Sequence, residues 1–232
     1  MQALACALGG RLCAHNNGTA KESLMTHILV LNSSISREAS VSRILVEEAV
    51  QRLIEVNPGA TVRQRDLGNS PIPHLTPATV AGVRAAASTP EEHVAAALSD
   101  ELIEELRAAD IIVIGAPMYN FSIASGLRTW FDHVIRPRVT FSYSEAGPQG
   151  LLTGKRILVI ESRGGLYSEG PSKAIDFQEP YLRWMLSFIG LSDVTFVHAE
   201  KIGFGVEARQ AALAHAKAQI GVAAAKTISH SS

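Results

Sequence analysis

Hydrophobic and polar positions along the chain alternate between two patterns, one typical of strands and one typical of helices. Short apolar runs bounded by polar residues are typical of buried parallel strands. Apolar residues spaced three and four positions apart indicate helices that cover a sheet. The predicted strands are His27–Asn32, Thr61–Asp66, Ile111–Ala116, Lys155–Glu161 and Val194–Ala199. Because the run from 111 to 116 is the most apolar, we expect that strand near the centre of the sheet.

Helical patterns fall between these strands. The first predicted helix begins at Ser40 and ends at the breaker Asn57-Pro58-Gly59, and the second begins at the capping box Thr89-Pro90-Glu91-Glu92. The others are Ala124–Ile135, Tyr181–Ile189 and about Val206 to Ala224. Five strands that alternate with helices predict an α/β fold, with one doubly wound, five-stranded parallel sheet and helices on both faces.

Two segments depart from this alternation. Residues 67–88 contain three prolines, which predicts a long irregular connection between the second strand and the next helix. Residues 139–153 contain a Gly-Pro pair and a further glycine, which favours a small hairpin or flap at the functional edge of the sheet.

The two ends of the chain differ from this body. Residues 1–24 lack a strand or helix pattern. A secretory signal would require a Lys or Arg before its apolar run, and none precedes the short run Ala3–Leu8. The order Ala3-Leu4-Ala5-Cys6 resembles a lipoprotein cleavage site, but the missing basic start argues against it. We expect an unstructured N-terminal extension over residues 1–24, a folded domain over residues 25–228, and a frayed tail after it.

Composition narrows the class of protein. The chain has 232 residues, of which 47% are hydrophobic and 19% charged, with a net charge of −1. This is enough apolar material for a sizeable core, and the balanced charge gives no basic stripe for a nucleic-acid backbone. No apolar run approaches the ~20 residues that span a bilayer. We therefore expect a cytoplasmic protein with neither a nucleic-acid nor a membrane partner.

Cysteines and histidines exclude several kinds of site. The two cysteines, Cys6 and Cys13, both precede the predicted domain, so a disulfide framework or a catalytic thiol in that domain is excluded. The eight histidines lack metal-ligand spacing, and we predict no metal site. His27, His133 and His198 are interpreted as core-edge or surface residues.

The candidate chemistry lies in the loops that follow three strands, since the carboxyl ends of parallel strands share one edge of a sheet. After the first strand, the segment 33–42 contains five serines and leads into a helix N-terminus. Unpaired N–H groups, the positive end of the helix dipole and hydroxyl donors favour a phosphate group there. The alternative is that Ser36 or Ser40 simply caps the helix.

The loop after the third strand is Pro117-Met118-Tyr119-Asn120-Phe121. Its two aromatic rings and its methionine suit a flat heterocycle, and Asn120 supplies polar contacts. The alternative is a loop that packs against the next helix.

The loop after the fourth strand is Ser162-Arg163-Gly164-Gly165. Paired glycines allow the backbone to approach a ligand closely or to adopt positive φ, and the alternative is a plain turn. Because all three loops lie on one edge, together they predict a planar ligand that carries a phosphate group.

Other catalytic signatures are missing from the sequence. No G-x-G-x-x-G follows the first strand, and Gly154-Lys155 precedes a strand instead of following one, so neither a dinucleotide turn nor a P-loop is present. The G-x-S-x-G and H-E-x-x-H motifs are also missing. We therefore assign no side chain as a catalytic acid, base or nucleophile.

Three motifs together resemble those of the FMN-dependent NADH-azoreductase and NADH:quinone oxidoreductase family of flavodoxin-like proteins. They are Asn32-Ser33-Ser34, Ala116–Phe121 and Ser162–Gly165. Further similar stretches are Leu98–Ile103, Gly147–Leu151, Thr153-Gly154-Lys155 and Phe188-Ile189-Gly190, so the resemblance covers about residues 26–225. It implies a strand order of 2-1-3-4-5, a homodimer, and one non-covalent FMN per subunit near the dimer interface.

The same resemblance implies which residues bind the cofactor. Those at the phosphate would be Ser34, Ser40, Val41 and Ser42. Those at the isoalloxazine would be Met118, Tyr119, Asn120 and Phe121, with Pro117 before them, and Ser162, Arg163, Gly164 and Gly165. The implied reaction is a two-electron ping-pong transfer, in which NADH or NADPH reduces FMN and leaves before a quinone or aromatic azo compound is reduced in the same place.

Other functions remain open at this stage. One is an NADPH-dependent FMN reductase that releases reduced flavin, and another is a flavodoxin-type electron carrier. The near-neutral charge and the long excursion over 139–153 argue against the carrier. A third is a flavin- or ligand-binding regulatory module without turnover.

Overall fold

The computed structural model describes residues 25–36, 39–145 and 147–226. Its centre is a five-stranded, all-parallel sheet of order β2-β1-β3-β6-β7, which is 2-1-3-4-5 when only these strands are numbered. The strands are β1 His27–Asn32, β2 Thr61–Asp66, β3 Ile111–Pro117, β6 Arg156–Ser162 and β7 Asp193–Ala199. The predicted parallel sheet and the strand order are confirmed.

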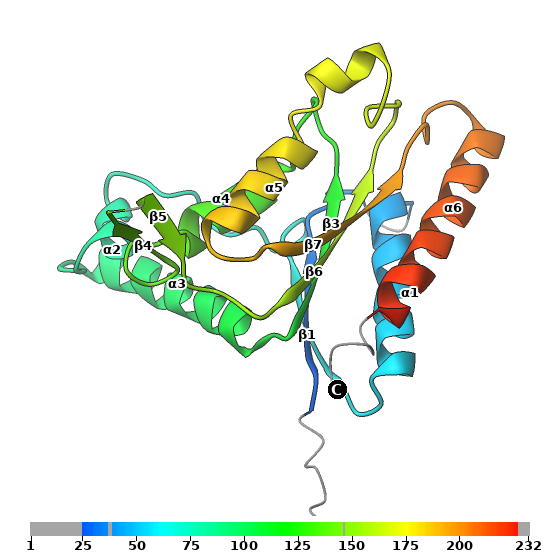
Figure 1. Cartoon of the computed structure of the whole chain (residues 1–232). Coiled ribbons are helices and arrows are strands. Elements are labelled where there is room, and N and C mark those ends of the chain that lie inside the picture. Colours follow the sequence, from blue (N-terminus) through cyan, green and yellow to red (C-terminus); the bar gives the residue numbers. More distant parts are fainter. Residues whose placement is uncertain (1–24, 37–38, 146, 227–232) are drawn as a thin grey trace, which may run out of the picture.

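Helices cover both faces of this sheet, as predicted (Figure 1). Two lie on one face: α1 Val41–Val56 and α6 Val206–Ala225. Three lie on the other: α3 Pro90–Ala108, α4 Ser125–Val134 and α5 Glu179–Phe188. A shorter helix, α2 Val80–Arg84, lies beside α3.

Side chains of β1 show why two helical layers are needed. Alternate residues of a strand point to opposite faces of the sheet. Ile28 and Val30 belong to the apolar core beneath α1 and α6, whereas Leu29 and Leu31 belong to the core beneath α3 and α4. Because both faces of β1 are buried, the strand is a continuous apolar run, and the sheet needs cover on each side.

Two helix starts form as the sequence predicts. Ser40 is the N-cap of α1, and its Oγ accepts a hydrogen bond from the backbone N–H of Arg43 at 3.3 Å. Thr89 and Glu92 form the capping box of α3, in which each side chain bonds to the backbone of the other residue. These side chains satisfy N–H groups that the first helical turns leave free.

The interruptions of the alternation have different outcomes. The hairpin expected over 139–153 is present as antiparallel β4 Phe141–Ser144 and β5 Gly147–Gly150. The connection expected to be irregular over 67–88 instead contains α2. Packing explains this difference, because the backbone of Gly82 lies so close to that of Glu92 that an added Cβ would be 2.1 Å from its carbonyl oxygen. Tertiary contact therefore stabilises a helix too short to show a periodic pattern.

Two further details complete the chain. A 3-10 helix, Pro171–Ile175, precedes α5, and α5 begins two residues before the predicted Tyr181, with Pro180 in its first turn. Within the described residues, none of the helices is long and apolar enough to cross a membrane. The predicted N-terminal extension and frayed tail lie outside the described residues.

Candidate functional site

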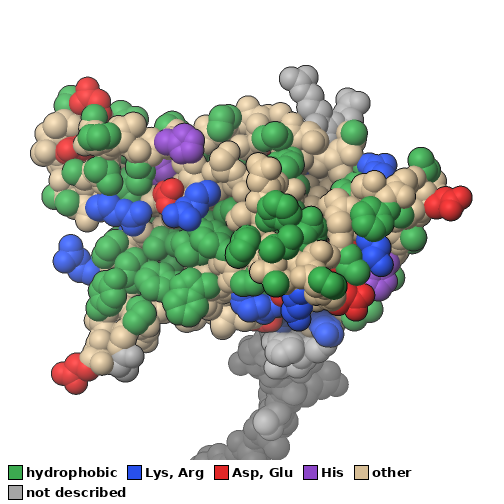
Figure 2. Space-filling view, turned by 90° about the horizontal axis from the view of Figure 1, so that it is seen from above, with side chains coloured by type: hydrophobic (Ala, Val, Ile, Leu, Met, Phe, Trp, Pro, Cys, Tyr) green, Lys and Arg blue, Asp and Glu red, His purple; other side chains and the backbone are tan. Residues whose placement is uncertain are grey.

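The three candidate loops lie at the carboxyl ends of β1, β3 and β6, where the arrowheads point upward in Figure 1. Strand pairing brings them together, since Asn32 is the register partner of Gly115, and Pro117 that of Ser162. The connections from β1 and β3 leave toward opposite faces of the sheet, and ligands of such folds bind at this switch point. Figure 2 looks onto this edge and shows a broad group of hydrophobic side chains bordered by Lys and Arg.

Hydroxyl groups gather at the N-terminus of α1. The Oγ of Ser40 donates to the Oγ of Ser34 at 2.9 Å and lies 3.1 Å from the Oγ of Ser42. All three serines are buried, and Val41 begins the helix beside them. The positive end of the helix and these hydroxyl donors are the groups that bind phosphate in proteins. Ser40 is also the helix cap, so the capping interpretation of this loop is confirmed, and phosphate binding stays a prediction.

Tyr119 connects this hydroxyl cluster with the loop after β3. Its hydroxyl accepts a hydrogen bond from the backbone N–H of Ile35 at 3.2 Å and lies 3.3 Å from the Oγ of Ser34. Two predicted parts of the site, separated by 85 residues, are therefore in direct contact.

The loop after β3 contains a tight turn. Tyr119 and Ser122 exchange two backbone hydrogen bonds of 2.9 and 3.0 Å, and the residues between them, Asn120 and Phe121, have φ of 48° and 68°. Positive φ at both central positions is the geometry of a type I′ turn. Asparagine tolerates this conformation, whereas phenylalanine rarely adopts it. Strained residues of this kind cluster at ligand sites, and the Phe121 side chain is exposed here.

A cavity of about 760 Å³ opens beside this turn. Its lining residues come from the loops after β1 and β3, from α4 and from α5: Ile35, Met118, Tyr119, Asn120, Ser122, Ile123, Ser125, Arg128 and Tyr181. Cavities of this size hold cofactor-sized ligands. A smaller cavity of about 470 Å³ beside α1 and β2 contains none of the predicted site residues. We place the candidate site in the larger one because the polar groups converge there.

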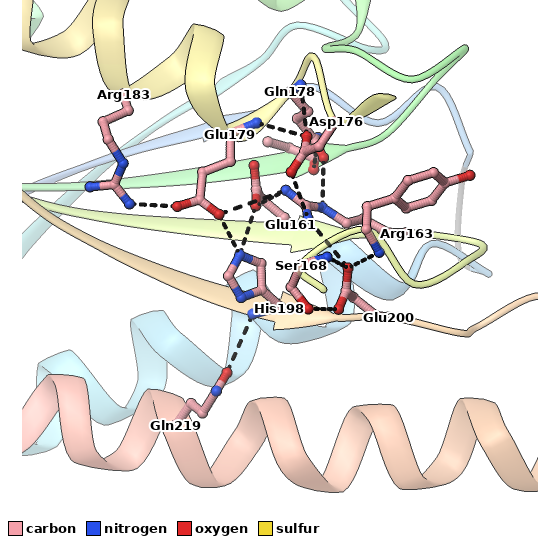
Figure 3. Close-up of polar contacts among 12 residues, drawn as sticks. Glu161, Arg163, Ser168, Asp176, Gln178, Glu179, Arg183, His198, Glu200 and Gln219 are labelled. Carbon is pink, nitrogen blue, oxygen red and sulfur yellow. Dashed lines mark hydrogen bonds and ion pairs between the residues drawn. The ribbon is translucent and has the colours of Figure 1, made fainter. Parts of the chain in front are cut away.

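Arg163, in the loop after β6, is fully buried with its side chain directed into the protein (Figure 3). Its guanidinium lies 2.5 Å from Glu161, 3.1 Å from Asp176 and 3.3 Å from Glu200. Its Nε donates to Gln178 at 3.1 Å. The guanidinium that the resemblance assigns to the isoalloxazine is therefore already bonded to other side chains of the protein.

The paired glycines after Arg163 fit one of their two expected uses. Neither Gly164 nor Gly165 has positive φ, so that expectation is wrong. A Cβ added at Gly164 would have no neighbour within 4 Å, which leaves open space beside its backbone. A Cβ at Gly165 would lie 3.1 Å from the ring of Tyr167. The close approach of a ligand to this backbone stays a prediction.

His198 of β7 extends the network around Arg163. Its Nε2 lies 3.1 Å from Glu161 and 2.9 Å from Glu179, and these two carboxylates raise the pKa of His198 to about 9. Hydrogen bonds from His198 and Arg183 lower the pKa of Glu179 to about 2. Burial raises the pKa of Glu161, while His198 and Arg163 favour its charged form. At neutral pH His198 is therefore charged and adds a cation to this network beside Arg163.

The same side chains meet the geometric requirement for a metal site. In the part of the chain that the structure describes, ligand atoms of Glu161, Glu179 and His198 lie within 4.8 Å of one another. The guanidinium of Arg163 lies 2.5 Å from Glu161 and 4.0 Å from Glu179, so the carboxylates already have a buried cation. We interpret the cluster as an ion-pair network.

The sequence analysis did not predict this network. Its members come from β6, the segment before α5, α5 itself, β7 and the turn after β7, at positions without shared periodicity: Glu161, Asp176, Gln178, Glu179, His198 and Glu200. Two signals were available, a charged residue inside the apolar run of β6 and a second one in β7, because a charge at a buried position needs a partner.

Comparison with known proteins gives a consistent result. A family model described as a flavodoxin-like fold matches residues 26–223. The chain is 62% identical over 196 residues to an FMN-dependent NADH:quinone oxidoreductase of Hyphomonas neptunium, covering 84% of this chain and 94% of that protein. It is 47% identical over 192 residues to an FMN-dependent NADH:quinone oxidoreductase of Herminiimonas arsenicoxydans, covering 82% and 94%.

Solved structures with the same architecture include two from Bacillus anthracis. An azoreductase from strain Sterne superposes with a TM-score of 0.79 at 28% identity, covering 87% of this chain and all of that one. An FMN-dependent NADH-azoreductase from the Ames Ancestor strain, in complex with FMN, superposes with a TM-score of 0.78 at 25% identity, covering 88% and 99%.

Proposed function

Because the chain belongs to the family of FMN-dependent NADH:quinone oxidoreductases with a flavodoxin-like fold, we propose that it uses NADH and FMN to reduce quinones and aromatic azo compounds. One observation supports the placement of this activity. The buried hydroxyl cluster at the start of α1 bonds, through Tyr119, to the strained aromatic turn beside the 760 Å³ cavity. A polar end and an aromatic end in direct contact match a cofactor with a phosphate and a flat ring system.

The residues present fit FMN. The phosphate would bind the hydroxyls of the serine cluster and the first N–H groups of α1: Ser34, Ser40, Val41 and Ser42. The ring system would lie against the turn after β3 and the backbone after β6: Pro117, Met118, Tyr119, Asn120, Phe121, Ser162, Arg163, Gly164 and Gly165. Open space beside Gly164 allows a ligand to approach that backbone.

When bound, FMN supplies the hydride and electron chemistry. The protein's part is to bind, to orient and to exclude water. Met118 and Tyr119 line one side of the cavity, and the type I′ turn holds Asn120 and Phe121 in fixed orientations. No side chain is assigned a proton-transfer role, because the groups with large pKa shifts in this region lie in the Arg163 network and bond to one another.

We further propose that the protein is a cytoplasmic homodimer. NADH is an intracellular donor, which supports the location. Phe121 and Phe177 are exposed side by side, since the N–H of Phe177 donates to the carbonyl of Phe121 at 3.1 Å, and Trp184 on α5 is exposed as well. Large exposed apolar side chains beside a site favour a partner surface. Light scattering of the purified protein would test the dimer.

The absorption spectrum of the purified protein, with and without NADH, tests the activity. We expect a flavin spectrum that persists through a desalting column, bleaches with NADH and returns when a quinone is added. Release of flavin during turnover would instead indicate an FMN reductase. A flavin that NADH alone cannot reduce would indicate an electron carrier or a regulatory module.

Initial rates with NADH and a quinone test the use of one site for both. NADH must give its hydride to the flavin ring and the quinone must take electrons from the same ring, so we propose that the cavity beside Tyr119 accepts one planar guest at a time. No dinucleotide motif suggests a separate site that retains NAD. We expect parallel lines in double-reciprocal plots. Intersecting lines together with a detectable ternary complex would show two sites and contradict this view.

A further inference from the structure

The turn after β6 is joined to the turn after β7. The N–H of Lys201 donates to the carbonyl of Gly165 at 2.8 Å, and the N–H of Gly203 donates to the carbonyl of Gly164 at 3.0 Å. The two glycines proposed to lie against the flavin are therefore hydrogen-bonded to the turn after β7, which contains Glu200.

Glu200 makes the densest contacts in this segment (Figure 3). Its Oε1 accepts hydrogen bonds from the backbone N–H groups of Tyr167 at 2.7 Å and Ser168 at 3.0 Å. Its Oε2 accepts the hydroxyl proton of Ser168 at 2.5 Å, and Arg163 lies 3.3 Å from Oε1. Burial raises the pKa of Glu200, but these donors outweigh it and hold the pKa below its usual value. Both carboxylate oxygens thus hold one short segment.

Tyr167, whose backbone Glu200 holds, contacts both the glycine turn after β6 and the aromatic turn after β3. Tyr167 lies 3.1 Å from where a Cβ of Gly165 would be, and its ring packs edge-to-face on Phe121 with centroids 6.2 Å apart. Tyr167 therefore lies between the glycine turn and the aromatic turn and packs against both. Sequence reasoning did not identify Tyr167 or Glu200 as site residues.

We propose that Glu200 is a positioning residue for the flavin site, which fixes the Gly164–Gly165 turn and the Tyr167 ring through hydrogen bonds to the backbone of Tyr167 and Ser168 and to the Ser168 hydroxyl. This inference rests on the proposed function, because the site it acts on is the proposed FMN site. Glu200 itself touches neither cofactor nor substrate in this scheme.

Hydrogen-bond geometry, more than charge, carries this role. Arg163 keeps Glu161, Asp176 and Gln178 when the charge of Glu200 is removed. By contrast, the hydrogen bonds that the structure records for the N–H groups of Tyr167 and Ser168 go to Glu200 alone. A glutamine at position 200 keeps an acceptor for these N–H groups, and its amide can donate to the Ser168 hydroxyl, whereas an alanine keeps nothing.

Fluorescence titration of the apoprotein with FMN tests the inference. We expect Glu200→Ala to raise the Kd for FMN at least tenfold, Glu200→Gln to stay within about threefold of the wild type, and Ser168→Ala to lie between them. Equal losses in the alanine and glutamine variants would assign the effect to charge and overturn the inference. Should Glu200→Ala fail to fold, an unchanged Kd in Ser168→Ala would overturn it as well.

Asp176→Ala is the matched control. Asp176 is also a buried carboxylate that pairs with Arg163 and accepts two backbone N–H bonds, but these come from Gln178 and Glu179 at the start of α5. We expect it to lower thermal stability about as much as Glu200→Ala while leaving the Kd for FMN within about threefold. A loss of FMN affinity in Asp176→Ala equal to that in Glu200→Ala would show that any destabilisation of the Arg163 network weakens binding, and would overturn the inference.

Wild-type affinity separates this inference from the proposed function. A wild-type protein that does not bind FMN would overturn the proposed function and this inference together. Wild-type binding with an equal Kd in Glu200→Ala would overturn the inference alone.

Discussion

The two ends of the candidate site are built from different kinds of polar group, neutral hydroxyls at one end and charged side chains at the other. The turn after β1 contains neutral hydroxyls that bond to one another, Ser34, Ser40 and Ser42. The turns after β6 and β7 contain full charges, with Arg163 buried among carboxylates such as Glu161. Both ends reach the carboxyl edge of the sheet, and both are largely shielded from water.

This difference determines which end can bind a ligand through side chains. A hydroxyl both donates and accepts, so the serine cluster can exchange an internal hydrogen bond for one to a phosphate. A guanidinium paired with buried carboxylates cannot change partners without leaving a charge unpaired, which costs several kcal/mol. The β1 end is therefore suited to side-chain contact, and the charged end to holding a backbone rigidly in place.

Arg163→Met gives the sharpest test of this difference. It leaves the buried carboxylates without their main cation, and we expect the free energy of unfolding to fall by about 3–5 kcal/mol. Urea unfolding followed by circular dichroism measures it. Arg183→Met removes an exposed arginine bonded to Glu179 at the rim of the same network, and it should cost less than about 1 kcal/mol. Similar losses of unfolding free energy in the two variants would show that burial of Arg163 adds nothing to its effect on stability, and would contradict the comparison.

The pH dependence of stability tests the charged end next. His198 faces Glu161 from β6, Glu179 from α5, Arg163 from the turn after β6 and Gln219 from α6. Its pKa is raised from 6.5 to about 9, so its stabilising contribution is complete below pH 6.5 and is lost as the pH rises through 9. We expect the Tm to fall between pH 7 and 9.5, and His198→Gln to flatten that fall.

Ser40→Ala tests the neutral end through its helix cap. Loss of the cap should lower the free energy of unfolding by about 1 kcal/mol, well below the effect of Arg163→Met. The Kd for FMN should rise at the same time, because the hydroxyl also belongs to the proposed phosphate site. A stability loss as large as that of Arg163→Met would show that the neutral end contributes as much to stability as the charged end, and would contradict the comparison.

Ser42→Ala should have the smallest effect on stability. Within the described residues, the hydroxyl of Ser42 bonds to Ser40 alone, and alanine is the better helix former, so the change should stay below about 0.5 kcal/mol. The Kd for FMN should nonetheless rise roughly three- to tenfold for one lost hydrogen bond. Ser187→Ala serves as the control with unchanged Kd, because the Ser187 hydroxyl donates to the carbonyl of Trp184 in its own helix, α5.

Features that depend on local sequence were predictable. The apolar alternation of β1, the cap at Ser40 and the capping box of Thr89 and Glu92 each arise within one turn or one strand. The placement of the three loops on one edge followed from the handedness of parallel connections. Hence the fold, and the hydroxyl cluster within it, could be predicted from the sequence.

Features that depend on distant partners were not predictable. Arg163 stands in a loop motif typical of a ligand site, but the direction of its side chain depends on carboxylates contributed by other elements. Helix α2 likewise forms because Gly82 fits against Glu92, which no periodic pattern records. In both cases packing between segments far apart in the chain decides the outcome.

The strand order has a consequence for how the molecule assembles. β7 is the last strand in the sequence and lies at the edge of the sheet, beside β6. Chains leave the ribosome N-terminus first, so β1, β2, β3 and β6 can pair before β7 is available. Until then the outer edge of β6 presents unpaired N–H and C=O groups, and Glu161 lacks its ion pair with His198. Pairing of β7 therefore covers the edge of β6 and completes the charge network at once, and β7 becomes the edge strand of the finished sheet.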